Sequence, residues 1–428
     1  MIIPALHRFA ADRKGNVAII FALALVPMIF LTGMAMDYTL ALRKNAQLNA
    51  AADAAALAAV TPAMMAQPDA NAIAAATNLF NSKAANITGL NYSGANLAVT
   101  VNDNGLNRTV TVAYTASSQN TFPGILNKAT WPLSGSSQAK STVMPNINFY
   151  LLLDSSPSMA IAGTSAGITT MVNNTSAQGG CAFACHESHP SADGLGNPGG
   201  EDNYALARNL GVTLRIDLLA QAVQNLMTTA QATETANNNT YKVAIYTFDV
   251  AFNLIQTLTS NLSAAQTAAS NIQVLEVYSN NWLTSSNNNS DTDTNWDLAM
   301  SDINTIMPNP GGGTNTQGDT PQEVLFIVTD GVEDQMVNGT RTYAMSTTEC
   351  TAIKNRGIRI AVLYTQYLPL PTNAWYNTYI APIASNIAPT MQACASPGLY
   401  FEVTTDGDIS SAMSALFQQA VATARLTQ

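Results

Sequence analysis

An uncharged apolar run near the start of the chain limits the possible architecture more than any other feature. It covers residues 16–36 and reads NVAIIFALALVPMIFLTGMAM, which is long enough, as a helix, to cross the hydrocarbon core of a bilayer. Pro27 interrupts the run, but proline is tolerated in membrane helices. A cleaved signal peptide is the alternative, because basic residues also precede its apolar segment. We favour an uncleaved anchor, because this run is longer than that segment usually is.

Basic residues flank the run on both sides: Arg8, Arg13 and Lys14 precede it, and Arg43 and Lys44 follow it. The first group favours a cytoplasmic stub over residues 1–15, whereas the second group weakens that orientation. With the stub in the cytoplasm, all residues after residue 37 lie outside the cytoplasm.

The four cysteines are consistent with an oxidising compartment, because their number is even and they fall into two pairs. We expect disulfides between Cys181 and Cys185 and between Cys350 and Cys394.

The segment CAFACHESH leaves two further possibilities open. Cys181, Cys185, His186 and His189 are chemically suited to zinc, although they are packed unusually tightly for a structural site. Cys-x-x-x-Cys-His is also one residue longer than the attachment motif of c-type haem. Spacing and compartment favour the disulfide over both.

Residues 37–145 predict a helical stalk followed by a small α+β module. The alanine-dense stretch LNAAADAAALAAV favours continuation of the membrane helix to about Pro62, and a second helix is expected over residues 70–82. Between residues 91 and 142 the pattern changes to alternation, and NDNG separates two β-branched runs. This is a strong hairpin signal.

Residues 146–428 predict an α/β domain. Short apolar strands (FYLLL, YKVAIYTF, EVLFIVT, IRIAVLY and LYFEVT) alternate with amphipathic helical stretches, which indicates a mostly parallel sheet with helices on both faces. Polar inserts interrupt the domain at residues 160–214 and 280–290, and loops of that length are commonly functional or disordered.

Oxygen-bearing side chains follow two of these strands. Asp154, Ser156 and Ser158 occupy alternate positions after FYLLL, and Asp330 leaves EVLFIVT at a glycine turn. Ligands bind at the carboxyl ends of strands in such sheets. An all-oxygen set suits Mg²⁺ or Ca²⁺, with Mn²⁺ also possible, rather than zinc or copper. Helix capping and turn formation are the alternative roles for these residues.

The pattern Asp-x-Ser-x-Ser that begins at Asp154, with TDG downstream, resembles the von Willebrand factor A domain and its metal-ion-dependent adhesion site. The resemblance implies that Asp154, Ser156, Ser158 and Asp330 are ligands and that a threonine from a separate loop completes the set. GGGTNT supplies an obvious candidate in Thr314.

In the family, however, the threonine loop precedes a helix that leads into the TDG strand, and Thr314 follows that helix. We therefore assign the role to Thr292, with Thr294 second. Ser290 and Asp291 replace the two glycines that the family has at this loop.

The resemblance implies a binding device rather than an enzyme: an open coordination position accepts an Asp or Glu side chain of a protein partner. Metal-dependent hydrolysis is less favoured, because the only histidines are His7, His186 and His189, and none lies in the expected site. A formal net charge of −10 with few cations excludes nucleic acid as a natural partner.

The start of the chain resembles the TadE/TadG-like proteins of the tight-adherence (Flp) pilus machinery. The resemblance is carried by Arg13, Lys14, Gly15 and Asn16 before the span, by Asp37 after it, and by the stretch from Ala50 to Ala59, which contains AADAAALAA. It implies a bacterial inner-membrane protein with a single span, most of whose chain lies in the periplasm or cell exterior among other pilus-assembly or envelope proteins. Ile20 stands where prepilin-like relatives have a glutamate, so we expect no processing at Gly15.

Together these features predict an envelope protein of Flp pilus assembly or adhesion. The alternative is a tip adhesin or a pilin-like subunit of the filament.

Overall fold

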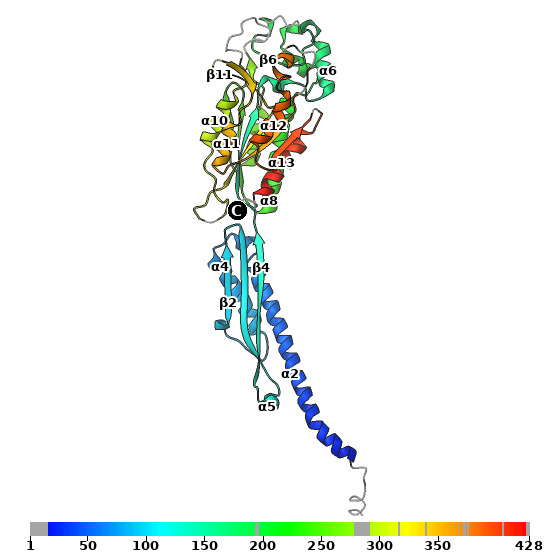
Figure 1. Ribbon diagram of the computed structural model, residues 1–428, viewed down its shortest axis with the longest axis vertical. Coiled ribbons are helices and arrows are strands. Elements are labelled where there is room, and N and C mark those ends of the chain that lie inside the picture. The colour runs from blue at the N-terminus through cyan, green and yellow to red at the C-terminus, as the bar shows by residue number, and fades with distance from the viewer. Residues whose placement is uncertain are drawn as a thin grey trace, which may run out of the picture. The chain divides into compact units, whose positions relative to one another are not determined.

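The computed structural model describes residues 16–192, 197–277, 292–315, 317–338, 340–367, 369–370, 374, 376–404 and 406–424. The predicted stub over residues 1–15 and the predicted insert over residues 280–290 lie outside them. The chain divides into two compact units, Met1–Val143 and Met144–Gln428 (Figure 1).

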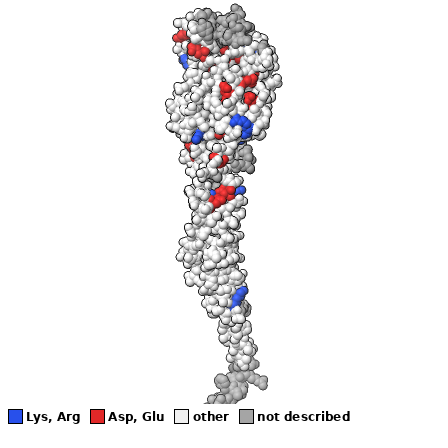
Figure 2. All heavy atoms as spheres, turned by 90° about the vertical axis from the view of Figure 1, so that its left-hand side faces the viewer, with Lys and Arg blue, Asp and Glu red and all other residues white. Residues whose placement is uncertain are grey.

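The first unit begins with one long helix, α2 (Asn16–Ala58), which contains Pro27. It is long and apolar enough to cross a membrane. Its first half leaves large apolar side chains exposed, among them Ile20, Leu23 and Leu31. The lowest part of the helix shows no charged side chain on the face drawn in Figure 2. An apolar surface of this kind requires lipid or other apolar helices around it.

An antiparallel sheet follows the helix, as the hairpin signal predicted. Strands β2 and β4 flank β3, and the short β1 continues the β2 edge. The elements of this unit after α2 are α3 (Pro62–Met65), α4 (Asp69–Ala85), β1 (Leu90–Asn91), η2 (Gly94–Asn96), β2 (Leu97–Asp103), β3 (Asn107–Gln119), α5 (Pro123–Leu126) and β4 (Thr130–Thr142).

The alanine-rich half of α2, which the sequence predicted as a helical stalk, continues the first half without a break and is part of the core of the α+β module. Leu48, Ala52, Ala55 and Ala59 are fully buried and pack in one cluster with Phe80 and with residues of β3. Small side chains allow the helix backbone to approach the sheet closely, so the alanines that favour a helix also favour this packing.

Asp37, the acidic residue just after the span, connects α2 to the start of α5. Its Oδ1 accepts a hydrogen bond from the Thr121 backbone N–H (2.7 Å) and its Oδ2 accepts one from the Phe122 N–H (3.2 Å). The side chain is buried. A carboxylate that accepts backbone N–H groups in this way satisfies two donors that would otherwise lack partners.

The second unit contains a six-stranded sheet in the order β14-β13-β10-β5-β7-β8. All neighbouring pairs are parallel except β7 with β8. The sequence predicted five of these strands and missed β8. The strands are β5 (Ile147–Asp154), β7 (Tyr241–Phe248), β8 (Phe252–Thr259), β10 (Gln322–Thr329), β13 (Arg359–Thr365) and β14 (Tyr400–Val403).

Helices cover both faces of this sheet, which confirms the predicted α/β class. One face packs against α8 (Arg215–Asn237), α9 (Leu262–Ala268) and α13 (Ile409–Thr423), and the other packs against α10 (Trp296–Ile306), α11 (Thr348–Asn355) and α12 (Ala384–Cys394). Alternate residues of β5 serve the two faces: Phe149 and Leu151 belong to the first core cluster, and Tyr150 and Leu152 to the second. Figure 1 shows α8 and α13 together on one side of the sheet and α10 and α11 on the other.

The first predicted insert is structured rather than an extended loop. After the turn η3 (Pro157–Ala160) it contains α6 (Ser165–Asn174), η4 (Ser176–Gln178), β6 (His186–Glu187), η5 (Pro190–Ala192), η6 (Pro198–Gly200) and α7 (Asn203–Asn209). Met171 and Leu206 anchor it in the core.

The remaining short elements of the second unit lie in the loops between its strands and helices. They are η7 (Ala269–Asn271), β9 (Glu276–Val277), β11 (Val332–Val337), β12 (Thr340–Ala344) and the π-helical turn η9 (Tyr376–Ile380).

One of the two expected disulfides is present. Cys350 and Cys394 are bonded and tie α11 to the end of α12, which confirms that pairing. The Cys181–Cys185 prediction is wrong, because both cysteines are free. The segment between them pairs through Phe183 with Ile161, and the Cys181 thiol donates to the Phe183 carbonyl (3.5 Å). The chain there therefore follows a neighbouring segment instead of closing the small loop that a disulfide would need.

Candidate functional site

Two carboxylates meet at the carboxyl end of the central strands. Asp154 is the last residue of β5, and Asp330 directly follows β10. The two strands are adjacent and parallel, with Val328 of β10 opposite Leu153 of β5. The parallel register brings both strand ends to one edge of the sheet, as the sequence pattern predicted.

Hydroxyl groups surround the Asp154 carboxylate. Its Oδ1 accepts hydrogen bonds from the Ser156 N–H (3.0 Å) and the Ser156 hydroxyl (2.6 Å), and its Oδ2 accepts one from the Thr329 hydroxyl (2.7 Å). The hydroxyl oxygens of Ser156 and Ser158 are 2.9 Å apart. The structure therefore groups Asp154, Ser156 and Ser158 in one oxygen cluster at the turn after β5.

Both carboxylates are buried without an exposed side, at 0% exposure each. Burial raises the pKa of Asp154 to about 7, and the negative charge of Asp330 adds to the increase. The hydrogen bonds from Ser156 and Thr329 lower the pKa but do not cancel the increase. Burial also raises the pKa of Asp330, whereas Arg215 and the Ser158 hydroxyl oppose that increase. Two like charges taken out of water at one place are unfavourable unless a cation compensates them.

Asp330 keeps one oxygen atom without a hydrogen bond. Its Oδ1 accepts from the Val332 N–H (3.2 Å), but the buried Oδ2 has no hydrogen-bond partner. The Arg215 guanidinium lies 3.9 Å from this oxygen, at ion-pair distance but too far for a hydrogen bond. A buried acceptor without a donor is rare in folded proteins and marks a position that an absent ligand can fill.

A third strand-end carboxylate, Asp249, was missed by the sequence analysis. It follows β7 and its Oδ2 accepts hydrogen bonds from the Ser155 hydroxyl (2.9 Å) and the Asn253 amide (3.0 Å). Its backbone carbonyl accepts from the Asn295 N–H (2.8 Å) at the start of α10. The run YTFD carries the same strand-then-aspartate signal as the other two strands, so the sequence could have revealed it.

The two threonine candidates lie at different places in the second unit. The Gly313 carbonyl accepts from the Asn146 N–H (2.7 Å), so Thr314 lies at the amino end of β5, roughly 25 Å along the strand from Asp154. Its hydroxyl donates to Asp319 instead (2.6 Å). Thr294 forms a β-bridge with Asp334 in the segment that follows Asp330. Thr292 precedes it by two residues, and its role as a ligand stays a prediction.

The donor set is suited to a hard divalent cation. It consists of carboxylate and hydroxyl oxygens, the ligands preferred by Mg²⁺ and Ca²⁺. Among the residues that the structure describes, no group of three or more His, Cys, Asp or Glu is placed to hold a metal ion. A cation here would therefore depend on Ser and Thr hydroxyls and on water for its remaining ligands.

The same finding leaves the zinc alternative for Cys181, Cys185, His186 and His189 without support in the described part of the chain. The ring of His186 instead pairs with Asp202, with 2.8 Å between Nδ1 and Oδ2.

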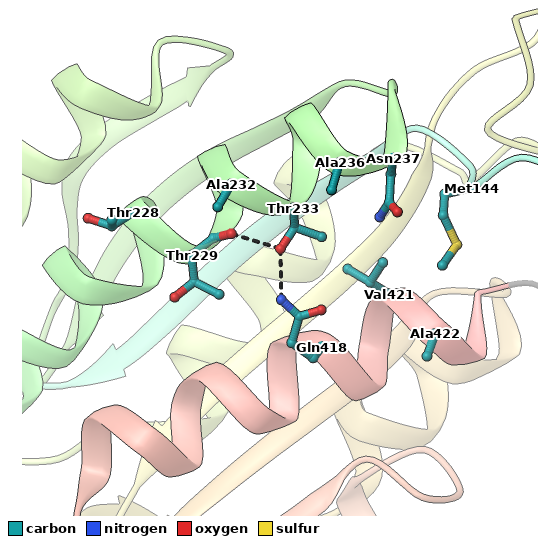
Figure 3. Close-up of a pocket in the computed structure, with 10 residues that line it drawn as sticks. All are labelled: Met144, Thr228, Thr229, Ala232, Thr233, Ala236, Asn237, Gln418, Val421 and Ala422. Carbon is teal, nitrogen blue, oxygen red and sulfur yellow. Dashed lines mark hydrogen bonds between the residues drawn. The ribbon is translucent and has the colours of Figure 1, made fainter. Parts of the chain in front are cut away.

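A pocket of about 560 Å³ lies elsewhere, between α8 and α13 (Figure 3). Threonine, alanine and amide side chains line it, and Gln418 donates to the Thr233 hydroxyl across it (2.7 Å). None of the described residues that line it is titratable. The oxygen cluster at the strand ends is therefore the better candidate for the functional site.

The sequence and the structure were compared with known proteins. Residues 15–76 match a family model described as "Putative Flp pilus-assembly TadE/G-like". The chain carries a TadE/G-like segment at its amino end. This segment contains α2, α3 and the first part of α4, which all belong to the first unit. A search of curated proteins found no match.

Several solved structures share a low similarity with this chain. BatB from Bacteroides thetaiotaomicron has 13% identity and a TM-score of 0.35, and covers 65% of this chain and 99% of its own. The von Willebrand factor domain of the type V pili tip protein Mfa5 from Porphyromonas gingivalis has 9% identity and a TM-score of 0.37, with coverages of 66% and 97%. Proximal thread matrix protein 1 from the mussel byssus, with a zinc-occupied MIDAS motif, has 13% identity and a TM-score of 0.34, with coverages of 65% and 46%.

Proposed function

We propose that this TadE/G-like protein is a membrane-anchored envelope component of Flp pilus assembly or adhesion, and that its α/β domain binds a protein partner through a divalent cation. The observation that carries the proposal is the oxygen cluster at the ends of β5 and β10. Two fully buried carboxylates meet there, and Asp330 Oδ2 lacks a hydrogen-bond donor. The TadE/G-like segment and the exposed apolar half of α2 support the pilus and membrane assignments.

The proposed ligands are Asp154, Ser156, Ser158, Thr292 and Asp330. The cation is Mg²⁺ or Ca²⁺, with Mn²⁺ as a further candidate, because all the donors are oxygen atoms. The cation supplies an open coordination position that an acidic side chain of the partner can occupy. The chain's own residues hold the site together: the Ser156 hydroxyl and N–H orient Asp154, and the Val332 N–H orients Asp330.

A binding role fits the site better than catalysis. Hydrolysis at a divalent cation needs a general base near the bound water. His186 pairs with Asp202 in the insert, and His189 is bonded to Ser188 (3.0 Å). Asp249, the third carboxylate, is engaged by Ser155 and Asn253. We therefore propose a non-enzymatic role, in the bacterial inner membrane with a single span and most of the chain in the periplasm or cell exterior.

Capture from cross-linked envelopes tests the proposal directly. The full-length chain should retain its partner with Mg²⁺ or Ca²⁺ present and lose it in EDTA, and Asp330→Ala should lose it under both conditions. Thr292→Ala should weaken capture. Thr314→Ala is the control: it also removes a threonine hydroxyl, but at the other end of the sheet, and should leave capture unchanged. Capture that is unchanged by EDTA and by Asp330→Ala would contradict the metal-dependent site.

The structure of the first unit favours a second candidate, a pilin-like subunit or tip adhesin. Its long helix packs its second half against a sheet and leaves its first half apolar and exposed, so that similar helices could surround it in a filament. Mechanical shearing separates the two roles. A filament protein is recovered with the sheared fraction, whereas an envelope component remains with the membranes.

A further inference from the structure

A buried guanidinium stands beside the carboxylates of the oxygen cluster. Arg215 is the first residue of α8, and its side chain is 5% exposed. Its Nη1 lies 3.9 Å from Asp330 Oδ2, and neither of these two buried atoms has a hydrogen-bond partner. The two groups therefore interact by charge alone, because they lack the hydrogen bonds that would make a tight ion pair.

Arg215 is held once at its backbone and once at its guanidinium. The Arg215 backbone N–H donates to the Ile161 carbonyl (2.9 Å), and Nη2 donates to the Gln366 carbonyl beyond β13 (2.5 Å). Ile161 and Gln366 are both buried or half-buried, so these contacts lie inside the domain. The bond to Gln366 and the burial of the side chain keep the guanidinium beside Asp330.

The position of this charge has consequences for an ion at the site. Asp154 and Asp330 together carry two negative charges when they are ionised, and Arg215 compensates one of them. A divalent cation bound to Asp330 would lie within a few ångströms of the guanidinium. Like charges at that separation repel strongly where water is excluded.

We propose, resting on the divalent-cation site proposed above, that Arg215 is a built-in cation that stabilises the site when it is empty and lowers its affinity for a divalent ion. Occupancy then follows the concentration of the ion around the cell instead of being permanent. Arg215 is on this account a positioning and affinity-setting residue, and it is not a metal ligand.

A purely structural role for Arg215 predicts something different. If the residue only joins α8 to the end of β13, its replacement lowers stability and leaves the affinity for the ion unchanged. Metal affinity and thermal stability therefore have to be measured on the same variants.

The test uses the full-length chain in detergent and follows free Mn²⁺ by its paramagnetic resonance signal during titration. Arg215→Met should bind Mn²⁺ at least about tenfold more tightly than the wild type, because the repulsion is removed. Arg215→Lys, which keeps the charge, should stay near the wild-type affinity. Arg359→Met is the matched control: it removes a half-buried guanidinium, which donates to the Ala420 carbonyl, and should lower stability only.

Melting in EDTA gives the second readout. Arg215→Met should melt at a lower temperature than the wild type in EDTA, and Mn²⁺ should raise its melting temperature by a larger amount. If Arg215→Met does not fold in EDTA, Arg215→Gln replaces it, because its side chain is uncharged but polar. Recovery of either variant by Mn²⁺ alone also supports the proposal.

The outcomes separate this inference from the proposed function. Equal or weaker Mn²⁺ binding by the uncharged variants overturns the role of Arg215, whereas the proposed function survives if the wild type binds Mn²⁺. If Arg215→Met binds Mn²⁺ and the wild type does not, the inference is supported, and the guanidinium alone is enough to prevent Mn²⁺ binding under these conditions. Absence of binding in every variant overturns both.

Discussion

Replacing Asp154 with asparagine should make the chain more stable in the absence of metal and unable to gain stability from it. Asp154 is fully buried, and burial raises its pKa from 3.8 to about 7. The fold thus holds the proton of this carboxyl more tightly than the unfolded chain does. The stabilising contribution of the protonated carboxyl is complete below about pH 4 and is lost as the pH rises towards 7.

The size of the effect follows from the pKa shift. A shift of about three units corresponds to about 4 kcal/mol of unfolding free energy, which is the penalty for holding the ionised carboxylate in the fold. Asparagine avoids that charge and keeps an oxygen for the bonds from Ser156, but it replaces the acceptor for Thr329 with a donor. We therefore expect a net gain of about 1–3 kcal/mol for Asp154→Asn in EDTA at about pH 8.

Hydrogen exchange followed by mass spectrometry gives the required measurement, because peptides from β5 and β10 report the opening of this unit alone. In EDTA the difference between the variant and the wild type should be large at about pH 8 and disappear at about pH 4. Excess Mg²⁺ should protect the wild type further and leave the variant unchanged.

Asp319→Asn is the matched control with the opposite sign. Burial alone would raise the pKa of Asp319, but hydrogen bonds from Thr314, Gly312 and Thr320 outweigh burial and lower it. The ionised form of Asp319 therefore stabilises the fold. Its replacement should destabilise the chain near neutral pH. If the wild type and Asp154→Asn show the same pH dependence in EDTA, Asp154 is not held in an unfavourable charged state and the reasoning is refuted.

Three further predictions follow from the described contacts. Replacing Cys350 and Cys394 with alanine should lower stability by about 4 kcal/mol, because the bond closes a loop of 44 residues; melting of the double variant with and without reductant checks this. Glu323→Gln should raise the melting temperature above about pH 8 and not below pH 4, because burial raises the Glu323 pKa to about 8; equal melting at both pH values would contradict it. Asp37→Ala should increase hydrogen exchange of the Thr121 and Phe122 amides, and unchanged protection there would show that its carboxylate is dispensable.

The parts of the fold that local patterns encode were predictable. The five apolar strands and the helices between them follow from periodicity, and the aspartates at the ends of β5 and β10 meet because parallel strands end at the same edge. The position of Thr314 at the opposite edge follows from the same topological reasoning.

Features that depend on the path of the chain were not predictable. Strand β8 consists of half-buried and exposed residues at the sheet edge and lacks a continuous apolar run. Arg215 reaches Asp330 only because the insert places the start of α8 over the strand ends, and 115 positions separate the two residues in the sequence. Cys181 and Cys185 are free, and the segment between them pairs with Ile161, a contact that the local sequence does not reveal.

The continuity of α2 has a mechanical consequence. A helix of 43 residues is about 65 Å long, and here the same helix forms the exposed apolar segment and part of the α+β core. No flexible linker separates the exposed apolar half of α2 from the folded module, so tension applied to that module passes along backbone hydrogen bonds into the apolar half. The packed alanine face, sheared along its length, would resist a pull until many contacts failed together, which suits a component that must hold its position under load.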